Sequence, residues 1–178
     1  MERQVFLLRA VNVGGTALPM ADLRSWATEL GATDVMTHLA SGNLLCVPPA
    51  DPEDFAMRLA VVIEDRLGVP REVIARTADE LRAAITAHPF PVTEPKMSHI
   101  GFMAAAPAGP AITAAGAFPT GDDAWRVIGR DLHVRFAHGA GRPDMNVDRL
   151  LRLLGEPVTM RNLRTVGALA ERARLTPS

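Results

Sequence analysis

The residues best suited to chemistry gather in LLRAVNVGG, residues 7–15, where an apolar run meets two glycines. Arg9 offers a fork of N–H donors that fits a carboxylate or a phosphate, and Asn12 adds an amide. Gly14 and Gly15 permit positive φ, so backbone amides can approach a ligand closely. The helix expected after this stretch directs its positive end toward the same place, which favours an anion. The stretch is therefore a candidate anion-binding site.

Two other interpretations of this stretch stay open. It has neither G-x-x-x-x-G-K-[ST] nor the spacing of a G-x-G-x-x-G dinucleotide fingerprint. In a purely structural interpretation the glycines make a turn, Asn12 caps backbone groups and Arg9 pairs with a nearby aspartate. The third interpretation is a contact with a protein or a nucleic acid.

The segment TMRNLRT, residues 159–165, is a second candidate. Arg161 and Arg164 could form a basic point for a phosphate. Asn162 and Thr165 are residue types that cap the start of a helix. The alternative is a well-capped helix whose arginines are solvated.

Other reactive residue types show no recognisable catalytic or metal-binding pattern. The histidines lack the spacing of a metal site, so we expect no metal, and the identity of any cofactor stays open. They are His38, His88, His99, His133 and His138. Cys46, the only cysteine, falls in an apolar run typical of a buried residue. The segment 138–144, HGAGRPD, is typical of a mobile surface loop, and a role in gripping a ligand stays open.

Composition limits the classes of partner. Of the 178 residues, 48% are apolar and 22% charged, and the formal net charge is −1, which argues against nucleic acid and anionic membranes. Six phenylalanines, two tryptophans and no tyrosine leave no aromatic run of the RNA-recognition type. The sequence contains neither a signal peptide nor a membrane-spanning run, so we expect a cytoplasmic protein.

The elements that position these residues follow the same order in both halves of the chain. Apolar periodicity, caps and turn residues predict strands and helices. In the first half, strands are expected at 4–11, 34–40, 44–47 and 72–75, and helices at 19–30, 51–67 and 77–85. In the second half, strands are expected at 99–106, 125–129, 132–137 and 157–160, and helices at 111–117, 146–155 and 165–173.

The repeated order β-α-β-β-α-β predicts an α+β protein of two tandem ferredoxin-like plaits, antiparallel sheets with helices packed on one face. The modules are expected at 1–90 and 96–178, joined by the Pro-rich linker 88–98. A single doubly wound Rossmann sheet is the alternative, but each half contains a hairpin where that fold needs a crossover helix.

In such a plait the loop after the first strand and the hairpin turn between the second and third strands lie at one end of the sheet. Residues 9–15 should therefore neighbour Ser41, Gly42 and Asn43, which form that turn.

Residues 7–45 also resemble the opening signature of the DUF1697 family of uncharacterised bacterial proteins, in which L-L-R-G-I-N-V-G-G is followed by P-M and S-G-N. TMRNLRTVGAL is similar to the family's C-terminal T-x-R-N-x-x-T-V signature. Ala10 departs from the pattern, which usually has glycine there. The matching positions are Arg9, Asn12, Gly14, Gly15, Met20, Ser41, Gly42, Asn43, Arg161, Asn162 and Thr165. The resemblance implies the tandem ferredoxin-like fold but no established activity, substrate or cofactor.

The function is therefore open at the level of sequence. One hypothesis is an anionic small molecule bound by Arg9, Asn12, Gly14, Gly15, Ser41, Asn43, Arg161 and Asn162. The other is a non-enzymatic interaction module, a homodimer or a nucleic-acid accessory, in which these residues are structural. The sequence does not decide between monomer and homodimer, or whether the protein is an enzyme.

Overall fold

The computed structural model describes residues 2–9 and 17–174, along which the order β-α-β-β-α-β-α occurs twice. The first series comprises β1 (Gln4–Leu8), α1 (Met20–Glu29), β2 (Thr33–Thr37), β3 (Asn43–Val47), α2 (Pro52–Leu67), β4 (Val73–Arg76) and α3 (Ala78–Thr86). The second comprises β5 (Ser98–Phe102), α4 (Gly109–Gly116), β6 (Ala124–Ile128), β7 (Asp131–Arg135), α5 (Val147–Leu154), β8 (Thr159–Asn162) and α6 (Leu163–Arg174). Within these ranges no helix is long and apolar enough to cross a membrane.

Each series forms one four-stranded antiparallel sheet. The strand order is β2-β3-β1-β4 in the first sheet and β6-β7-β5-β8 in the second. The first strand of each series is central and pairs with the third and fourth strands. The α+β class with two antiparallel sheets is thus confirmed, and the parallel sheet of the Rossmann alternative is absent from the described residues.

Capping residues begin or end several helices at the positions expected from the sequence. The carboxylate of Asp51 accepts two first-turn amides of α2, and Gly68 ends that helix with φ 69°. The amide of Glu80 donates to the Thr77 hydroxyl, and the Thr77 amide donates to the Glu80 carboxylate, at 3.0 and 2.8 Å. This is the reciprocal capping box expected from the sequence. Gly155, with φ 76°, ends α5 in the same way as Gly68 ends α2.

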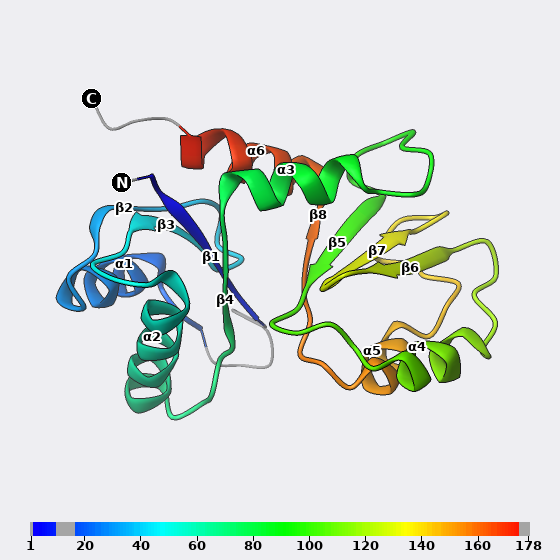
Figure 1. The fold of residues 1–178 in the computed structure, drawn as a ribbon, viewed down its shortest axis with the longest axis horizontal. Helices are drawn as coiled ribbons and strands as arrows, with labels where there is room; N and C mark the ends of the chain where they lie inside the picture. The colour runs from blue at the N-terminus through cyan, green and yellow to red at the C-terminus, as the bar shows by residue number, and fades with distance from the viewer. Residues whose placement is uncertain (1, 10–16, 175–178) are drawn as a thin grey trace. The chain divides into compact units, whose positions relative to one another are not determined.

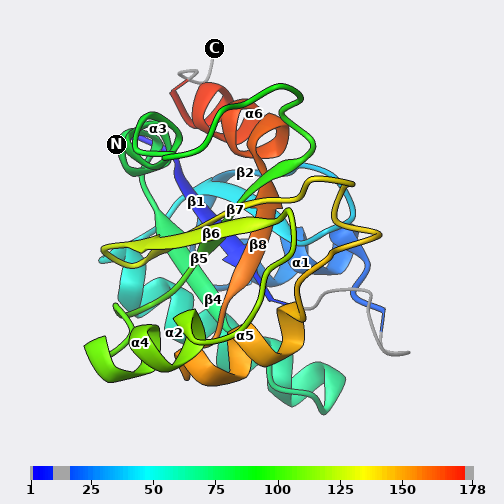
Figure 2. The same ribbon diagram turned by 90° about the vertical axis from the view of Figure 1, so that its right-hand side faces the viewer.

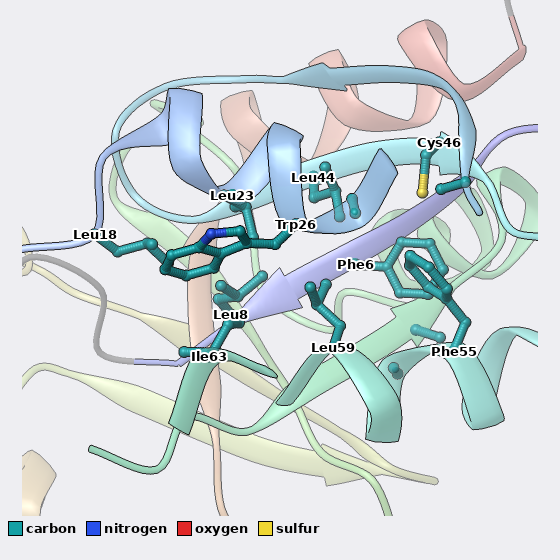
Figure 3. Packing of buried hydrophobic residues seen from close by; sticks show 14 residues of the cluster. Phe6, Leu8, Leu18, Leu23, Trp26, Leu44, Cys46, Phe55, Leu59 and Ile63 are labelled. Atoms are coloured by element: carbon teal, nitrogen blue, oxygen red, sulfur yellow. The ribbon is translucent and has the colours of Figure 1, made fainter. Parts of the chain in front are cut away.

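The core of the first sheet lies under α1 and α2, which cover one of its faces (Figure 1). Phe6 of β1 meets Phe55 of α2 edge to face, with ring centroids 4.9 Å apart. Trp26 of α1 packs over the neighbouring leucines (Figure 3). Cys46 is fully buried in this cluster, and burial raises the pKa of its thiol to about 12. A thiol held protonated in an apolar core has a packing role and is no nucleophile.

The core of the second sheet lies under α4 and α5, which run beside one another (Figure 2). Leu132 and Val134 of β7 point into this cluster together with Met103, Met145 and other apolar side chains. The residues that alternate with them on β7 lie on the opposite face of the sheet.

The chain divides into two compact units by its internal contacts. The first comprises the described residues of Met1–Arg82 and Ala168–Ser178, and the second is Ala83–Gly167. Both boundaries fall inside helices, α3 at one and α6 at the other.

The units defined by contacts have other bounds than the modules expected at 1–90 and 96–178, and those modules stay a prediction. The Pro-rich segment 88–98 follows α3, and its last residue, Ser98, begins β5. The second half of α6 is assigned to the first unit, where a guanidinium N–H of Arg3 donates to the backbone oxygen of Arg172 at 3.0 Å.

A buried arginine occupies the same position in both sheets. Arg76 of β4 lies opposite Val5 of β1, and Arg161 of β8 lies opposite Ile100 of β5. In each case Nη1 donates to the carbonyl of the preceding residue, at 2.9 and 2.8 Å. Each arginine also directly precedes the residue that caps the following helix, Thr77 or Asn162. The repeated placement supports an internal duplication.

The register of this repeat differs from the one that a match of identical letters would give. Matching Arg76-Thr77 to the later Arg-Thr pair at 164–165 aligns identical letters. In the structure Arg76 corresponds to Arg161, and the capping residue Thr77 corresponds to Asn162, whose carbonyl accepts from an amide in α6. The register in the structure is set by the pairing of the strands, and a short sequence identity carries no information about that pairing.

Candidate functional site

The end of β1 lies beside the turn between β2 and β3. Leu7 is opposite Asn43, and the amide of Leu8 donates to the carbonyl of Gly42 at 2.9 Å. The last residues of β1 therefore neighbour the turn. Asn12, Gly14 and Gly15 lie outside the described residues, so the described part of the candidate site consists of Arg9 and the turn.

The charged side chain of Arg9 is partly exposed to solvent. Its backbone amide donates to the carbonyl of Glu72 at 3.0 Å, which fixes its position at the end of the sheet. Its Nη1 lies 3.4 Å from Oε1 of Glu72, and the two side chains are 44% and 45% exposed. The acid is a glutamate and not the aspartate of the structural interpretation. A half-exposed pair at this distance contributes little to stability, roughly 0–1 kcal/mol, so a bound anion could replace Glu72.

Asn43 has a structural task in the turn. Its side chain is fully buried, and its Nδ2 donates to the carbonyl of His38 at 2.8 Å and to the hydroxyl of Ser41 at 3.0 Å. Gly42 at the tip has φ 76°, which glycine adopts without strain. Ser41 is exposed. Of the turn residues, Ser41 is thus the one with a side-chain group at the surface.

Arg161 and Asn162 belong to the second unit, and each is bonded within it. Asn162 caps α6, because its Oδ1 accepts from the amide of Thr165 at 2.9 Å. Arg161 is 9% exposed, and its Nη1 donates to the Thr159 hydroxyl at 2.9 Å and to the Met160 carbonyl at 2.8 Å. Burial lowers the pKa of Arg161 to about 10. Asn162 therefore has the capping role that the sequence offered as an alternative.

A pair of histidines, which no spacing in the sequence reveals, meets in the second unit. The Nδ1 atoms of His88 and His133 lie 3.3 Å apart, and the side chain of His133 is fully buried. Burial, followed by the nearby charge of His88, lowers the pKa of His133 to about 4. Burial also lowers the pKa of His88. Both rings are therefore neutral at pH 7 and could share one proton in the bond between them.

The loop expected at 138–144 is anchored by a buried carboxylate. Asp123 is 4% exposed and accepts the amides of Ala137, Asp144 and Met145 at 2.8, 2.7 and 3.1 Å. A carboxylate that accepts three backbone amides fixes the course of the chain on both sides of the loop. These hydrogen bonds hold the two ends of the loop in place, although the composition of the loop is typical of a mobile segment.

Beside this anchor, three exposed side chains could together hold a metal ion. Asp122, His138 and Asp144 each offer a ligand atom, and these atoms lie within 4.8 Å of one another. It is the one such cluster of histidine, cysteine and acidic side chains in the described part of the chain. The residues are far apart in sequence, which explains why spacing alone did not indicate them.

Among the comparisons with known proteins, one shows a similar fold and none names an activity. A family model described as "Protein of unknown function (DUF1697)" matches residues 1–133. A similar solved structure is that of the conserved bacterial protein SP0830 from Streptococcus pneumoniae, with a TM-score of 0.74 at 16% identity. The alignment covers 98% of this chain and 99% of that one. Among curated proteins no match was found.

Proposed function

Because the chain belongs to the DUF1697 family of proteins of unknown function, we propose a function from its own residues: it binds a small anionic molecule at the end of β1. Arg9 would hold the anion, with the hydroxyl of Ser41 and the loop of Asn12, Gly14 and Gly15 completing the site. The proposal concerns binding and leaves catalysis open. For Arg161 and Asn162 the bonds described above favour a structural role, and the proposed site does not depend on them.

The half-exposed pair of Arg9 and Glu72 carries this proposal. The backbone bond to Glu72 holds the arginine in place, while 44% of its side chain meets solvent. The start of α1 would add to the site, because its cap residue Pro19 makes no side-chain capping bond. The amides of the first turn are therefore available to an anion at the positive end of the helix.

Calorimetric titration of the protein with pyrophosphate and with citrate tests the proposal. We expect saturable binding that Arg9→Met weakens on the order of tenfold, because a charge-assisted hydrogen bond contributes about 1.5–3 kcal/mol. Arg58→Met, which removes an exposed arginine from α2, is the matched control and should leave the affinity unchanged. Glu72→Gln should strengthen binding, since it removes the competing carboxylate. Equal affinity in wild type and Arg9→Met would overturn the site.

We also propose a finer description of the architecture and location. The strand order β2-β3-β1-β4, with two helices on one face, supports a ferredoxin-like plait for each series of elements. Tandem modules at 1–90 and 96–178, joined by 88–98, account for the repeat. The single cysteine is in keeping with a cytoplasmic location in a bacterium.

An interaction module is the second candidate, and an exposed apolar pair on α2 favours it. Met57 is 63% exposed and Val61, one turn further along, is 57% exposed. Neighbouring apolar side chains on a helix surface are a common feature of protein contacts. Light scattering across a range of concentrations tests for a homodimer, and Val61→Lys should dissociate it. A strict monomer at millimolar concentration would exclude the dimer.

A further inference from the structure

The second unit contains a pocket between α4 and α5 that the sequence analysis did not indicate. Its volume is about 190 Å³. Apolar side chains form its walls: Phe118 follows α4, Trp125 comes from β6, Met145 precedes α5, and Leu150 and Leu153 come from α5. Most ligand sites in proteins have such a mainly apolar lining with a few polar groups.

Arg149 supplies the main polar group of the pocket. Its guanidinium carbon lies 3.3 Å from the centroid of the Phe118 ring, so the charge rests on the aromatic face. Stacking fixes the guanidinium plane while its N–H donors stay available at the edge. Among the described residues Arg149 forms no ion pair. The pocket therefore presents a positioned cation whose charge no acid in the described chain balances.

The one acid in the lining, Asp144, is engaged outside the pocket. Its Oδ2 accepts the backbone amide of Asp122 at 3.1 Å and lies 3.8 Å from Nε2 of His138. Its own amide is bound by Asp123. The carboxylate of Asp144 thus belongs to the anchored loop and does not neutralise Arg149.

We propose that this pocket binds a small aromatic carboxylate, with the ring among Trp125, Met145 and Leu150 and the carboxylate on Arg149. An apolar cavity of roughly 150 Å³ is large enough to hold benzene, so 190 Å³ admits one six-membered ring with a short substituent. Arginine pairs with a carboxylate through two parallel N–H···O bonds, which orients the ligand. The site is in the second unit and is independent of the anion site proposed at β1.

Phenylacetate is the probe, and Trp125 reports its binding. The chain has two tryptophans, so Trp26→Phe leaves Trp125 as the single fluorophore. Saturation-transfer NMR of phenylacetate with the unmodified protein gives a second readout that does not depend on this substitution in the core. Phenylacetamide tests the need for the charge, and acetate tests the need for the ring.

We expect a saturable change in Trp125 fluorescence with phenylacetate, and weaker binding of both phenylacetamide and acetate. Arg149→Met should weaken phenylacetate binding on the order of tenfold, as loss of a charged hydrogen-bond partner predicts. Arg152→Met removes an exposed arginine of the same helix that does not line the pocket, and it should bind like wild type.

Two results would overturn the site or the role of Arg149, and a third would overturn the role of the apolar walls. One is the absence of saturable phenylacetate binding to the unmodified protein by either readout. The other is equal affinity in Arg149→Met and Arg152→Met, because binding would then not depend on the charge in the pocket. Equal binding of acetate and phenylacetate would likewise refute the role of the apolar walls.

Discussion

Acid should destabilise the second unit through the buried histidine pair. His133 has an ordinary pKa near 6.5 when the chain is unfolded, and burial lowers it to about 4 in the folded protein. Directly opposite His133 on the neighbouring strands lie Ile100 and Arg126, neither of which offers a carboxylate to an imidazolium. His88, whose Nδ1 lies beside that of His133, is itself a base whose pKa burial lowers.

The sign and size of the effect follow from proton linkage. Between pH 6.5 and pH 4 the unfolded chain binds a proton at His133 that the folded protein does not bind, so the free energy of unfolding decreases as pH falls. The contribution of His133 is fully present above pH 6.5 and lost by about pH 4. At about 1.4 kcal/mol per pH unit, His133 accounts for about 2 kcal/mol between pH 7 and pH 5. His88 acts in the same direction.

Urea unfolding at several pH values measures this contribution. His133→Leu removes the titrating group, so its free energy of unfolding should fall less than that of the wild type between pH 7 and pH 5, by about 2 kcal/mol. His138→Gln, which removes an exposed histidine, is the control and should keep the wild-type pH dependence. Only the difference in pH dependence matters, because the substitution also changes packing. Parallel curves for wild type and His133→Leu would refute the reasoning.

Three further substitutions have expected effects on the urea midpoint. Asp123→Ala leaves three backbone amides without their acceptor and should cost about 2–4 kcal/mol, whereas an unchanged midpoint would show that water replaces the carboxylate. Gly121→Ala should lower the free energy of unfolding by about 1–2 kcal/mol, because the φ of Gly121 is +60° and a Cβ there would lie 2.7 Å from the Cβ of Asp144. Gly116→Ala in α4 places its Cβ in open space and should be neutral or stabilising. Asn162→Ala should cost about 1 kcal/mol through loss of the α6 cap, and Asn162→Asp should restore most of it.

Local signals explain why the order of the elements could be predicted from the sequence. The glycines that end α2 and α5 adopt the positive φ that their residue type permits. The capping box of Thr77 and Glu80 needs three residues of spacing and nothing else from the fold. Such features depend on residues only a few positions apart, so the ends of these helices can be predicted from the sequence.

Partnerships across the fold could not be predicted in the same way. Glu72 is 63 residues from Arg9, and the sequence offers many acids as partners. His88 and His133 are 45 residues apart in the sequence. They meet because β7, which contains His133, is an inner strand of its sheet and the segment after α3 brings His88 beside it. The placement of Ser41 near the end of β1 could be inferred, since it follows from strand order alone. The pocket at Arg149 could not, because its walls come from four separate segments.

The assignment of the second half of α6 to the first unit has a consequence for biosynthesis. A ribosome releases the residues up to Arg82 early, but the segment from Ala168 to Arg174 that belongs with them emerges only after the whole second unit. During translation the first sheet is therefore synthesised before the second half of α6, whose backbone Arg3 contacts. Domains usually complete their folding in the order of synthesis. Here the first unit whose synthesis begins is the last that can be completed.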